Sequence, residues 1–310
     1  MKKDDTKILK SGFRGAILGS AIGDAVGELA FHCMSRNSLE EAADTQEILT
    51  YTDDTAMMIG LAESLIQDGD VYPESLGKIF HRHYDEEPWR GYAGGPPRIF
   101  SSVAAKRCLY TDSAQSLYGG KGSFGNGAAM RVVPIGLVYR NDEKLYEKVR
   151  KSALPTHAHP VGIDGAALIA KSVAWAVACR YREDTLAHDL FDILMPFCRT
   201  ETIRKRLEQA STMIVRKESE AMAGFALGSG VEAQNSVGFA LFAFLSHPDS
   251  FEDCLYSAAL NSTDRDTVAC MACAISGAYL GIEALPQKWR EKIENEEYLV
   301  ELADSLLDVC

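Results

Sequence analysis

The sequence predicts an all-α protein, with roughly a dozen helices in one compact domain over residues 1–310. Two observations lead to this prediction. Apolar residues recur at intervals of three and four along most of the chain, which is the period of an amphipathic helix, and no segment alternates apolar and polar residues as a half-buried strand does. Hydrophobic residues make up 46% of the chain, which is enough to form the core of one large domain.

Local signals place the individual helices. Small residues recur every three or four positions in residues 12–31, so this helix is expected to pack closely against another. Residues 36–50 are polar and irregular, and a loop is expected there. The other periodic segments predict helices over residues 56–67, 73–84, 99–106, 128–139, 161–180, 185–197, 201–213, 236–246, 251–260, 268–283 and 296–308, with one more after Pro286.

Two glycine-rich segments interrupt these helices. Residues 90–97 contain too much glycine and proline for a helix interior and predict a loop. Residues 119–127 form a second glycine-rich loop, which is expected to lead into the helix at 128–139. A flexible loop that ends at a helix N-terminus can offer several backbone N–H groups to a phosphate. A simple tight connection is equally consistent, because the loop lacks the Gly-Lys-Ser/Thr ending of a Walker motif.

Charge and cysteine content restrict the possible functions. The formal net charge is −12, so nucleic acid is not expected as the main partner. We see no signal peptide and no run of about 20 uninterrupted apolar residues, so a membrane span is not expected. Eight separate cysteines, mostly in apolar helical segments, indicate reduced thiols, and we expect a cytoplasmic monomer. Cys270 and Cys273 have no second pair, which disfavours zinc or redox chemistry.

Two short acidic segments each precede an apolar helix. The first acidic corner is residues 51–55, Tyr-Thr-Asp-Asp-Thr, and the second is residues 264–267, Asp-Arg-Asp-Thr. Such residues often cap helices, but capping needs one acid or hydroxyl, and each corner has several. Four carboxylates gathered together would repel one another unless cations neutralised them. Oxygen ligands without His or Cys suit Mg²⁺, Mn²⁺ or Ca²⁺, so the corners predict a two-metal site.

Histidine and aromatic residues near the second glycine-rich loop are candidates for contact with a ligand. His157 and His159 lie in a predicted loop, and substrate contact is favoured over zinc because oxygen ligands are already present. Tyr118 directly precedes residues 119–127, and Phe124 lies among the glycines of that loop. Aromatic residues at such positions usually belong partly to the core, but they could also stack on a flat base.

Six segments in chain order resemble the ADP-ribosylglycohydrolase family of all-α, Mg²⁺-dependent hydrolases, which includes the dinitrogenase-reductase-activating enzyme. They are GAILGSAIGDAVG, YTDDTAMM, RGYAGG, GKGSFGNGAAMRVVPIG, THAHPVGIDGA and STDRDTVACMACAISGAYLGIEALP. The resemblance covers about residues 12–290 and implies a compact orthogonal multi-helix bundle. RGYAGG and GKGSFGNGAAMR are most similar to the branch that removes ADP-ribose from serine and cleaves poly(ADP-ribose).

The resemblance implies a function and a role for individual residues. The implied reaction is hydrolysis that releases ADP-ribose from protein side chains, through a serine or arginine linkage, or from related O- and N-linked ADP-ribose. The implied cofactor is two Mg²⁺ ions, with Mn²⁺ as a substitute, bound by Thr52, Asp53, Asp54, Asp264, Asp266 and Thr267. The implied substrate-binding residues, which cradle the diphosphate and hold the adenine, are Gly94, Tyr118, Gly122, Ser123, Phe124, Gly125, Asn126 and His157.

Two segments depart from the family pattern. Residues 261–263, Asn-Ser-Thr, stand where the family usually has a pair of glycines. Phe31 stands about where the family generally places a glutamate linked to acid/base work, and Glu28 lies one helical turn earlier as a substitute. Asp53 and Asp54 are the candidates for activating water. The alternatives are a catalytically silent ADP-ribose-binding relative and a two-metal phosphohydrolase.

Overall fold

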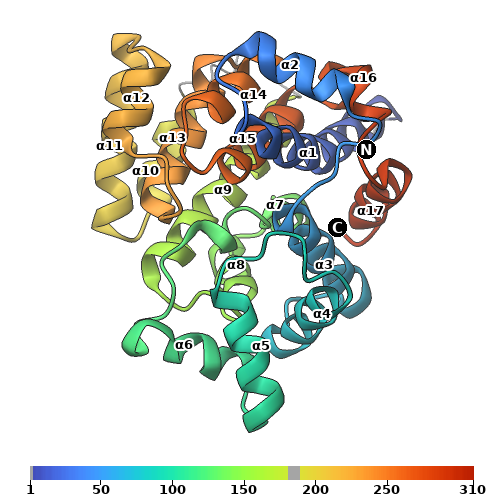
Figure 1. Cartoon of the computed structure of the whole chain (residues 1–310), viewed down its shortest axis with the longest axis vertical. Helices are drawn as coiled ribbons and strands as arrows, with labels where there is room; N and C mark the ends of the chain where they lie inside the picture. The colour runs from blue at the N-terminus through green and yellow to red at the C-terminus, as the bar shows by residue number, and fades with distance from the viewer. Residues whose placement is uncertain (1–2, 181–188) are drawn as a thin grey trace.

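The computed structural model describes residues 3–180 and 189–310, which are helical apart from connecting loops and two isolated β-bridges. This confirms the predicted all-α class (Figure 1). The α-helices are α1 (Lys3–Ala30), α2 (Arg36–Thr45), α3 (Asp53–Asp68), α4 (Pro73–Glu86), α5 (Gly95–Lys106), α6 (Tyr110–Gly120), α7 (Val133–Val138), α8 (Leu145–Ala153), α9 (Pro160–Cys179), α10 (Asp189–Phe197), α11 (Glu201–Arg216), α12 (Glu220–Leu227), α13 (Ala233–Ser246), α14 (Phe251–Leu260), α15 (Arg265–Leu280), α16 (Gln287–Arg290) and α17 (Glu296–Asp308), with 3-10 turns η1 (Asn126–Ala128) and η2 (Ile282–Ala284).

The packing of α1 against α15 is the central helix contact of the molecule. One face of α1 carries a glycine at every fourth position, at residues 15, 19, 23 and 27, and this face lies on the backbone of α15. A Cβ added at Gly19 would lie 2.5 Å from the carbonyl oxygen of Cys273, so only glycine permits this approach. Because the two helices run antiparallel, Gly27 near the end of α1 meets Asp266 in the first turn of α15.

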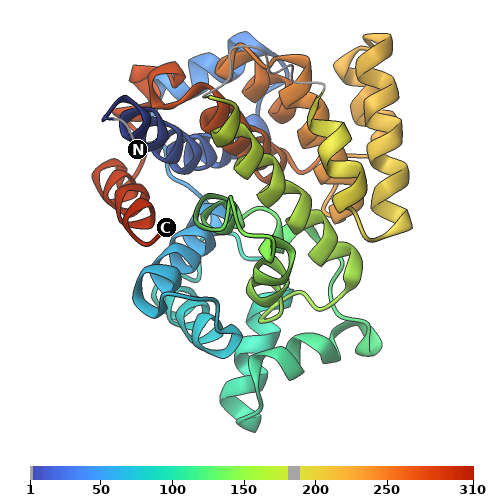
Figure 2. The same cartoon turned by 180° about the vertical axis from the view of Figure 1, so that it is seen from behind.

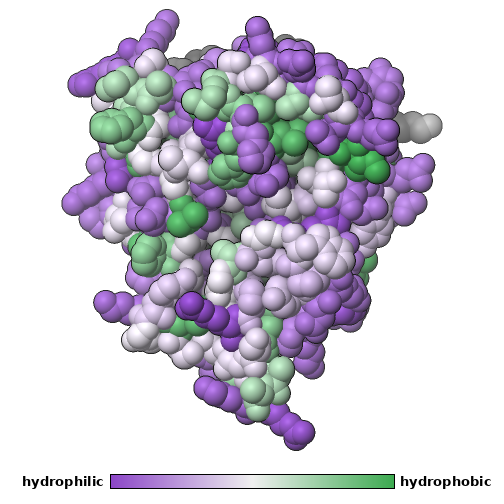
Figure 3. Space-filling model, viewed as in Figure 1, coloured by the Kyte–Doolittle hydropathy of each residue, from purple (hydrophilic) through white to green (hydrophobic). Residues whose placement is uncertain are grey.

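Helix α9 passes through the core between α7, α8, α13 and α15 (Figure 2). By length and composition it is apolar enough to cross a bilayer, but 89% of its most apolar stretch is buried inside the protein, as in the core helix of a globular protein. The first and last helices, α1 and α17, pack against each other. The surface seen in Figure 3 is largely polar, with hydrophobic side chains in small separate patches.

Four helices were not expected from the sequence: α2, α6, α8 and α12. Helix α2 corrects the first part of the loop expected over residues 36–50, while residues 46–50 are non-helical as expected. Ser35 and Ser38 form a capping box at its N-terminus, and it buries only Leu39 and Ala43. So narrow an apolar face leaves little periodic signal in the sequence.

The helix expected over residues 128–139 also needs correction. The second glycine-rich loop leads into η1, and α7 begins only at Val133. Pro134 stands in the first turn of α7, where its missing N–H and fixed φ are best tolerated. The loop therefore does not end at the N-terminus of an α-helix. Of the helix expected over 185–197, residues 185–188 lie outside the described ranges, and α10 accounts for the rest.

Candidate functional site

The two acidic corners meet where α3 and α15 begin. Residues from both corners line one pocket of about 230 Å³, here called the inner pocket: Asp53, Asp54, Asp264, Asp266 and Thr267. Thr267 Oγ1 donates a hydrogen bond to Asp54 Oδ2 at 3.3 Å, which joins residues 213 positions apart. Thr52 Oγ1 lies 3.4 Å from the same Asp54 oxygen. The structure thus brings together all six residues expected to bind metal.

A fifth carboxylate, Asp24 on α1, holds the first acidic corner in place. It is fully buried and accepts hydrogen bonds from the backbone N–H and the hydroxyl of both Thr52 and Thr55, at 2.6–3.1 Å. These bonds fix where α3 starts. Asp24 was not among the predicted site residues. Its one signal in the sequence is a carboxylate within the glycine-rich, apolar stretch of α1, where only polar partners would stabilise it.

Burial and mutual repulsion raise the pKa values of the clustered carboxyl groups. For Asp53 and Asp54 burial is the largest cause, followed by the charges of Asp24 and Asp266. The pKa of Asp264 rises to about 6, because of burial and then the charge of Asp266, although Asn126 Nδ2 donates to Asp264 Oδ2 at 2.5 Å. Positive charge placed among these groups would favour their ionised forms.

The cluster also has unused ligand atoms. Asp54 Oδ1 and Asp266 Oδ1 are buried and have no hydrogen-bond partner. Buried oxygens of this kind, beside threonine hydroxyls, fit a hard divalent cation. In the described part of the chain, no three or more His, Cys, Asp or Glu side chains are already grouped to hold an ion, so metal binding stays a prediction.

The inner pocket continues from the carboxylates along both glycine-rich loops. Five of the predicted substrate-binding residues line it: Tyr118, Ser123, Gly125, Asn126 and His157. The other three do not. Gly122 packs against Ala158 and the backbone of His159 with φ +73°, and Gly94 caps α5 beside open space. Phe124 is 44% exposed, and its ring makes a T-shaped contact with that of His159.

The second glycine-rich loop has a shape fixed by its own hydrogen bonds. The N–H of Gly122 donates to Leu117 O at 3.1 Å, that of Gly125 to Ser123 Oγ at 3.2 Å, and that of Asn126 to Val231 O at 2.9 Å. These three N–H groups already donate to acceptors within the protein, so they do not offer free hydrogen bonds to a phosphate. A diphosphate bound here would be held by other groups of the loop and by side chains around it.

A buried hydrogen-bonded network lies behind this loop, and it joins the predicted residue His157 to Arg131 and Thr156, which were not among the predicted site residues. Arg131 is fully buried and donates to Gly127 O at 2.8 Å and to Thr156 Oγ1 at 2.7 Å. Thr156 Oγ1 lies 2.8 Å from His157 Nδ1. This oxygen accepts from Arg131, and a ring hydrogen on Nε2 would let its own proton go to His157 Nδ1. Burial lowers the pKa of His157 to about 3, so the ring is neutral.

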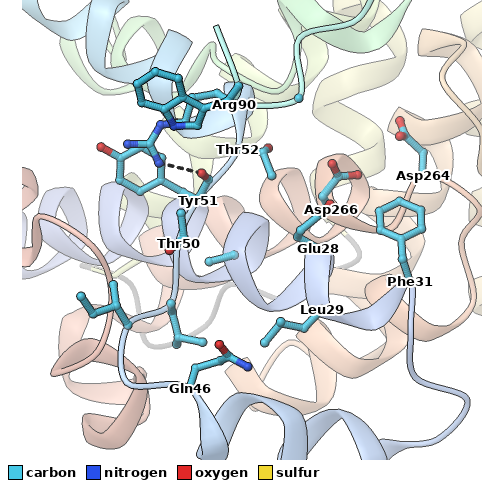
Figure 4. Close-up of a pocket in the computed structure, with 15 residues that line it drawn as sticks. Glu28, Leu29, Phe31, Gln46, Thr50, Tyr51, Thr52, Arg90, Asp264 and Asp266 are labelled. Atoms are coloured by element: carbon cyan, nitrogen blue, oxygen red, sulfur yellow. Dashed lines mark hydrogen bonds between the residues drawn. The ribbon is translucent and has the colours of Figure 1, made fainter. Parts of the chain in front are cut away.

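A second cavity of about 530 Å³, here called the outer cavity, lies beside the same carboxylates (Figure 4). Glu28, Phe31, Asp264 and Asp266 contribute to its wall. Because Gly27 packs on the backbone of Asp266, the Glu28 side chain extends from α1 toward that residue (Figure 4). Burial, and next the charge of Asp266, raises the pKa of Glu28.

Ser229 fixes the segment that departs from the family glycine pair. Its carbonyl oxygen accepts from the N–H groups of Thr263 and Asp264, at 3.2 and 3.0 Å, and from Thr263 Oγ1 at 3.1 Å. These bonds hold the backbone of Thr263 and Asp264 in place, so Asp264 lines the inner pocket although residues 261–263 contain no glycine.

Comparisons with known proteins agree with this architecture. Residues 5–310 match the family model described as ADP-ribosylglycohydrolase. The ADP-ribosylhydrolase ARH3 of Danio rerio is 31% identical, covering 97% of this chain and 91% of that protein, and the one of Homo sapiens is 32% identical, covering 96% and 93%. The ADP-ribosylarginine hydrolase Tri1 of Pseudomonas putida (strain GB-1) is 26% identical, covering 95% and 77%. A solved structure described as an ADP-ribosylglycohydrolase-related protein complex shares the fold, with a TM-score of 0.76 and 23% identity over 98% of this chain and 99% of that one.

Proposed function

The chain belongs to the ADP-ribosylglycohydrolase family, and on that basis we propose that it cleaves ADP-ribose from modified protein side chains with the help of two Mg²⁺ ions, for which Mn²⁺ can substitute. The observation that carries the proposal is the meeting of both acidic corners at one end of a pocket whose other walls are the two glycine-rich loops. The resemblance of RGYAGG and GKGSFGNGAAMR to the serine-directed branch supports a serine linkage, and the similarity to the ADP-ribosylarginine hydrolase Tri1 supports an arginine linkage.

In this proposal each part of the ligand has its own contacts. Tyr118 lies beside the adenine, since it is the aromatic side chain that lines the inner pocket next to the glycine-rich loop. The diphosphate lies along residues 123–127, within reach of the neutral His157 Nε2–H. The distal ribose then lies at the carboxylates, with its C1″ atom toward Asp266.

The two ions would be held by Thr52, Asp53, Asp54, Asp264, Asp266 and Thr267. When bound, they would supply positive charge that orients the ribose hydroxyls and activates a water. Water adds to C1″ as the bond to the side-chain oxygen or nitrogen breaks, through an oxocarbenium-like state. Asp53 or Asp54 takes the proton of the water. Glu28, placed beside Asp266 with a raised pKa, gives a proton to the leaving side chain.

A catalytically silent ADP-ribose-binding protein is the second candidate, and Phe31 is the observation that favours it. No carboxylate stands at this position, where the family generally places a glutamate. The presence of Glu28 in the same cavity wall favours turnover over binding alone.

Incubation with peptides ADP-ribosylated on serine, arginine or glutamate, with and without EDTA, tests the proposal. We expect free ADP-ribose from the serine or arginine peptide, and none after EDTA. AMP with ribose phosphate would instead identify a two-metal phosphohydrolase, and tight binding of ADP-ribose without turnover would identify a binding protein. Mass spectrometry of the products separates these outcomes.

A further inference from the structure

Building on the proposed function, we propose that the outer cavity binds the polypeptide segment that carries the ADP-ribosylated side chain. Trp89, Ile48 and Phe31 are its apolar contacts. The cavity is more than twice the volume of the inner pocket, at about 530 against 230 Å³, so it can accommodate more than a water or a single small side chain.

Continuity with the inner pocket is the first argument. Gly91, Asp264 and Asp266 line both cavities, so the carboxylates form a shared wall. A ligand that extends from Tyr118 to these carboxylates has its leaving group at that wall. The outer cavity begins on the same residues, and the chain of the modified protein would therefore enter it.

The exposed apolar side chains are the second argument. Trp89 is 71% exposed, Ile48 59% and Phe31 45%, and all three line the outer cavity. Large apolar side chains gathered around a concave surface are typical of binding sites, whereas single exposed ones need no explanation. Gln46 and Thr50 add hydrogen-bonding groups to the same wall.

The backbone that carries these side chains is anchored. Leu49, next to Ile48, donates to Lys292 O at 2.8 Å and accepts from the N–H of Glu294 at 3.0 Å. Arg90, next to Trp89, donates to Tyr51 O at 3.0 Å (Figure 4) and forms ion pairs with Glu294 and Glu87. A preformed surface of this kind binds a flexible segment at a lower entropic cost.

Charge selects the kind of partner. The whole chain has a net charge of −12, which disfavours nucleic acid or an anionic lipid surface as the occupant. The apolar side chains around the cavity, with Gln46 and Thr50 beside them, fit a polypeptide segment.

Two substrates with the same linkage test the proposal: a serine-ADP-ribosylated peptide and ADP-ribosyl-serine as the single amino acid. We expect Trp89→Ala to lower kcat/KM about tenfold for the peptide, the effect of losing about 1.4 kcal/mol, and to leave the value for the amino acid unchanged. Phe225→Ala is the control, since Phe225 is 85% exposed on α12 and lines neither cavity.

An equal effect of Trp89→Ala on the two substrates, or none on either, would overturn the proposal for the outer cavity alone. Failure of the wild type to release ADP-ribose from both serine substrates and from an arginine-ADP-ribosylated peptide would overturn the proposed function, and this proposal with it. Activity of Trp89→Ala on the amino acid also shows that the variant is folded.

Discussion

Glu28 and Phe31 lie near the C-terminal end of α1 and line the same cavity. The ring of Phe31 cannot transfer a proton, whereas Glu28 places a carboxyl group of α1 in the same cavity wall as Asp266. Burial raises the pKa of Glu28, so a larger fraction is protonated near neutral pH than for an exposed glutamate. A raised pKa of this kind suits a proton donor.

Substitution of this carboxyl group by an amide tests its role. We expect Glu28→Gln to lower kcat by at least about tenfold and to leave KM nearly unchanged, because general acid catalysis typically contributes 10²–10⁴-fold. Steady-state kinetics as a function of pH is the measurement, and Glu41→Gln on the exposed face of α2 is the control. An unchanged kcat would show that Glu28 is not the proton donor.

The side chains behind the glycine-rich loop give a second prediction at this scale. Thr156→Val removes the hydroxyl between Arg131 and His157 and leaves a buried donor unsatisfied, at a cost of about 1–3 kcal/mol. We expect weaker binding of ADP-ribose by calorimetry and a lower unfolding free energy. Thr156→Ser keeps the hydroxyl and should restore both. Equal behaviour of the two variants would show that the hydroxyl does not position His157.

The contrast between these residues shows what sequence alone can predict in the site. The acidic corners could be found because each contains several carboxylates and hydroxyls at a helix start. Asp24, Arg131 and Thr156 could not, because their roles depend on partners that only tertiary packing supplies. Phe124 was expected in the pocket from its place beside the loop, but the loop turns its ring toward His159.

At the scale of helices, the crossing of α1 and α15 positions the site, since it brings Asp24 and Glu28 beside Asp266. We expect Gly19→Ala to lower the unfolding free energy by about 1–3 kcal/mol, the usual cost of overpacking, because the new Cβ would meet Cys273 O at 2.5 Å. Chemical denaturation measures this. Gly238→Ala in α13 is the control, where a Cβ meets only ordinary contacts. Equal stability of both variants would contradict the close packing.

The helices that the sequence did not predict share a physical cause. Helix α2 buries only two residues. In α6, Leu117, Tyr118 and Gly119 have non-helical backbone angles, so no continuous pattern marks the segment. Helix α3 was predicted to within three residues at its start and one at its end, because Thr52 and the acidic residues after it mark the start and Gly69, with φ +69°, ends it.

At the scale of the whole molecule, folding gathers five buried or nearly buried carboxyl groups at one place, and this predicts a pH dependence. The folded pKa values of Asp24, Asp53 and Asp264 are raised to about 7, 8 and 6, from usual values of 3.8. These groups therefore ionise first in the unfolded chain, so the stability that they contribute is fully present below about pH 4 and is lost as the pH rises toward 8.

Thermal unfolding in EDTA at pH 6 and pH 8 measures this effect. We expect a lower Tm at pH 8, at roughly 2–4 °C per kcal/mol for a chain of this size, and Mg²⁺ should remove most of the difference. Asp53→Asn, which removes one charge, is expected to reduce the pH dependence. A Tm in EDTA that rises from pH 6 to pH 8 would contradict the assigned directions of the pKa shifts.

One comparison tests most directly whether the two acidic corners form one metal-dependent catalytic site. The wild type and Asp266→Asn are each incubated with a serine- or arginine-ADP-ribosylated peptide to measure release of ADP-ribose, and Mg²⁺ is titrated into both by calorimetry. Asp192→Asn on the exposed surface of α10 is the matched control. We expect two Mg²⁺ ions and free ADP-ribose with the wild type and the control, and loss of both with Asp266→Asn, by at least about 10² in rate. Full release of ADP-ribose by Asp266→Asn would contradict the two-metal site.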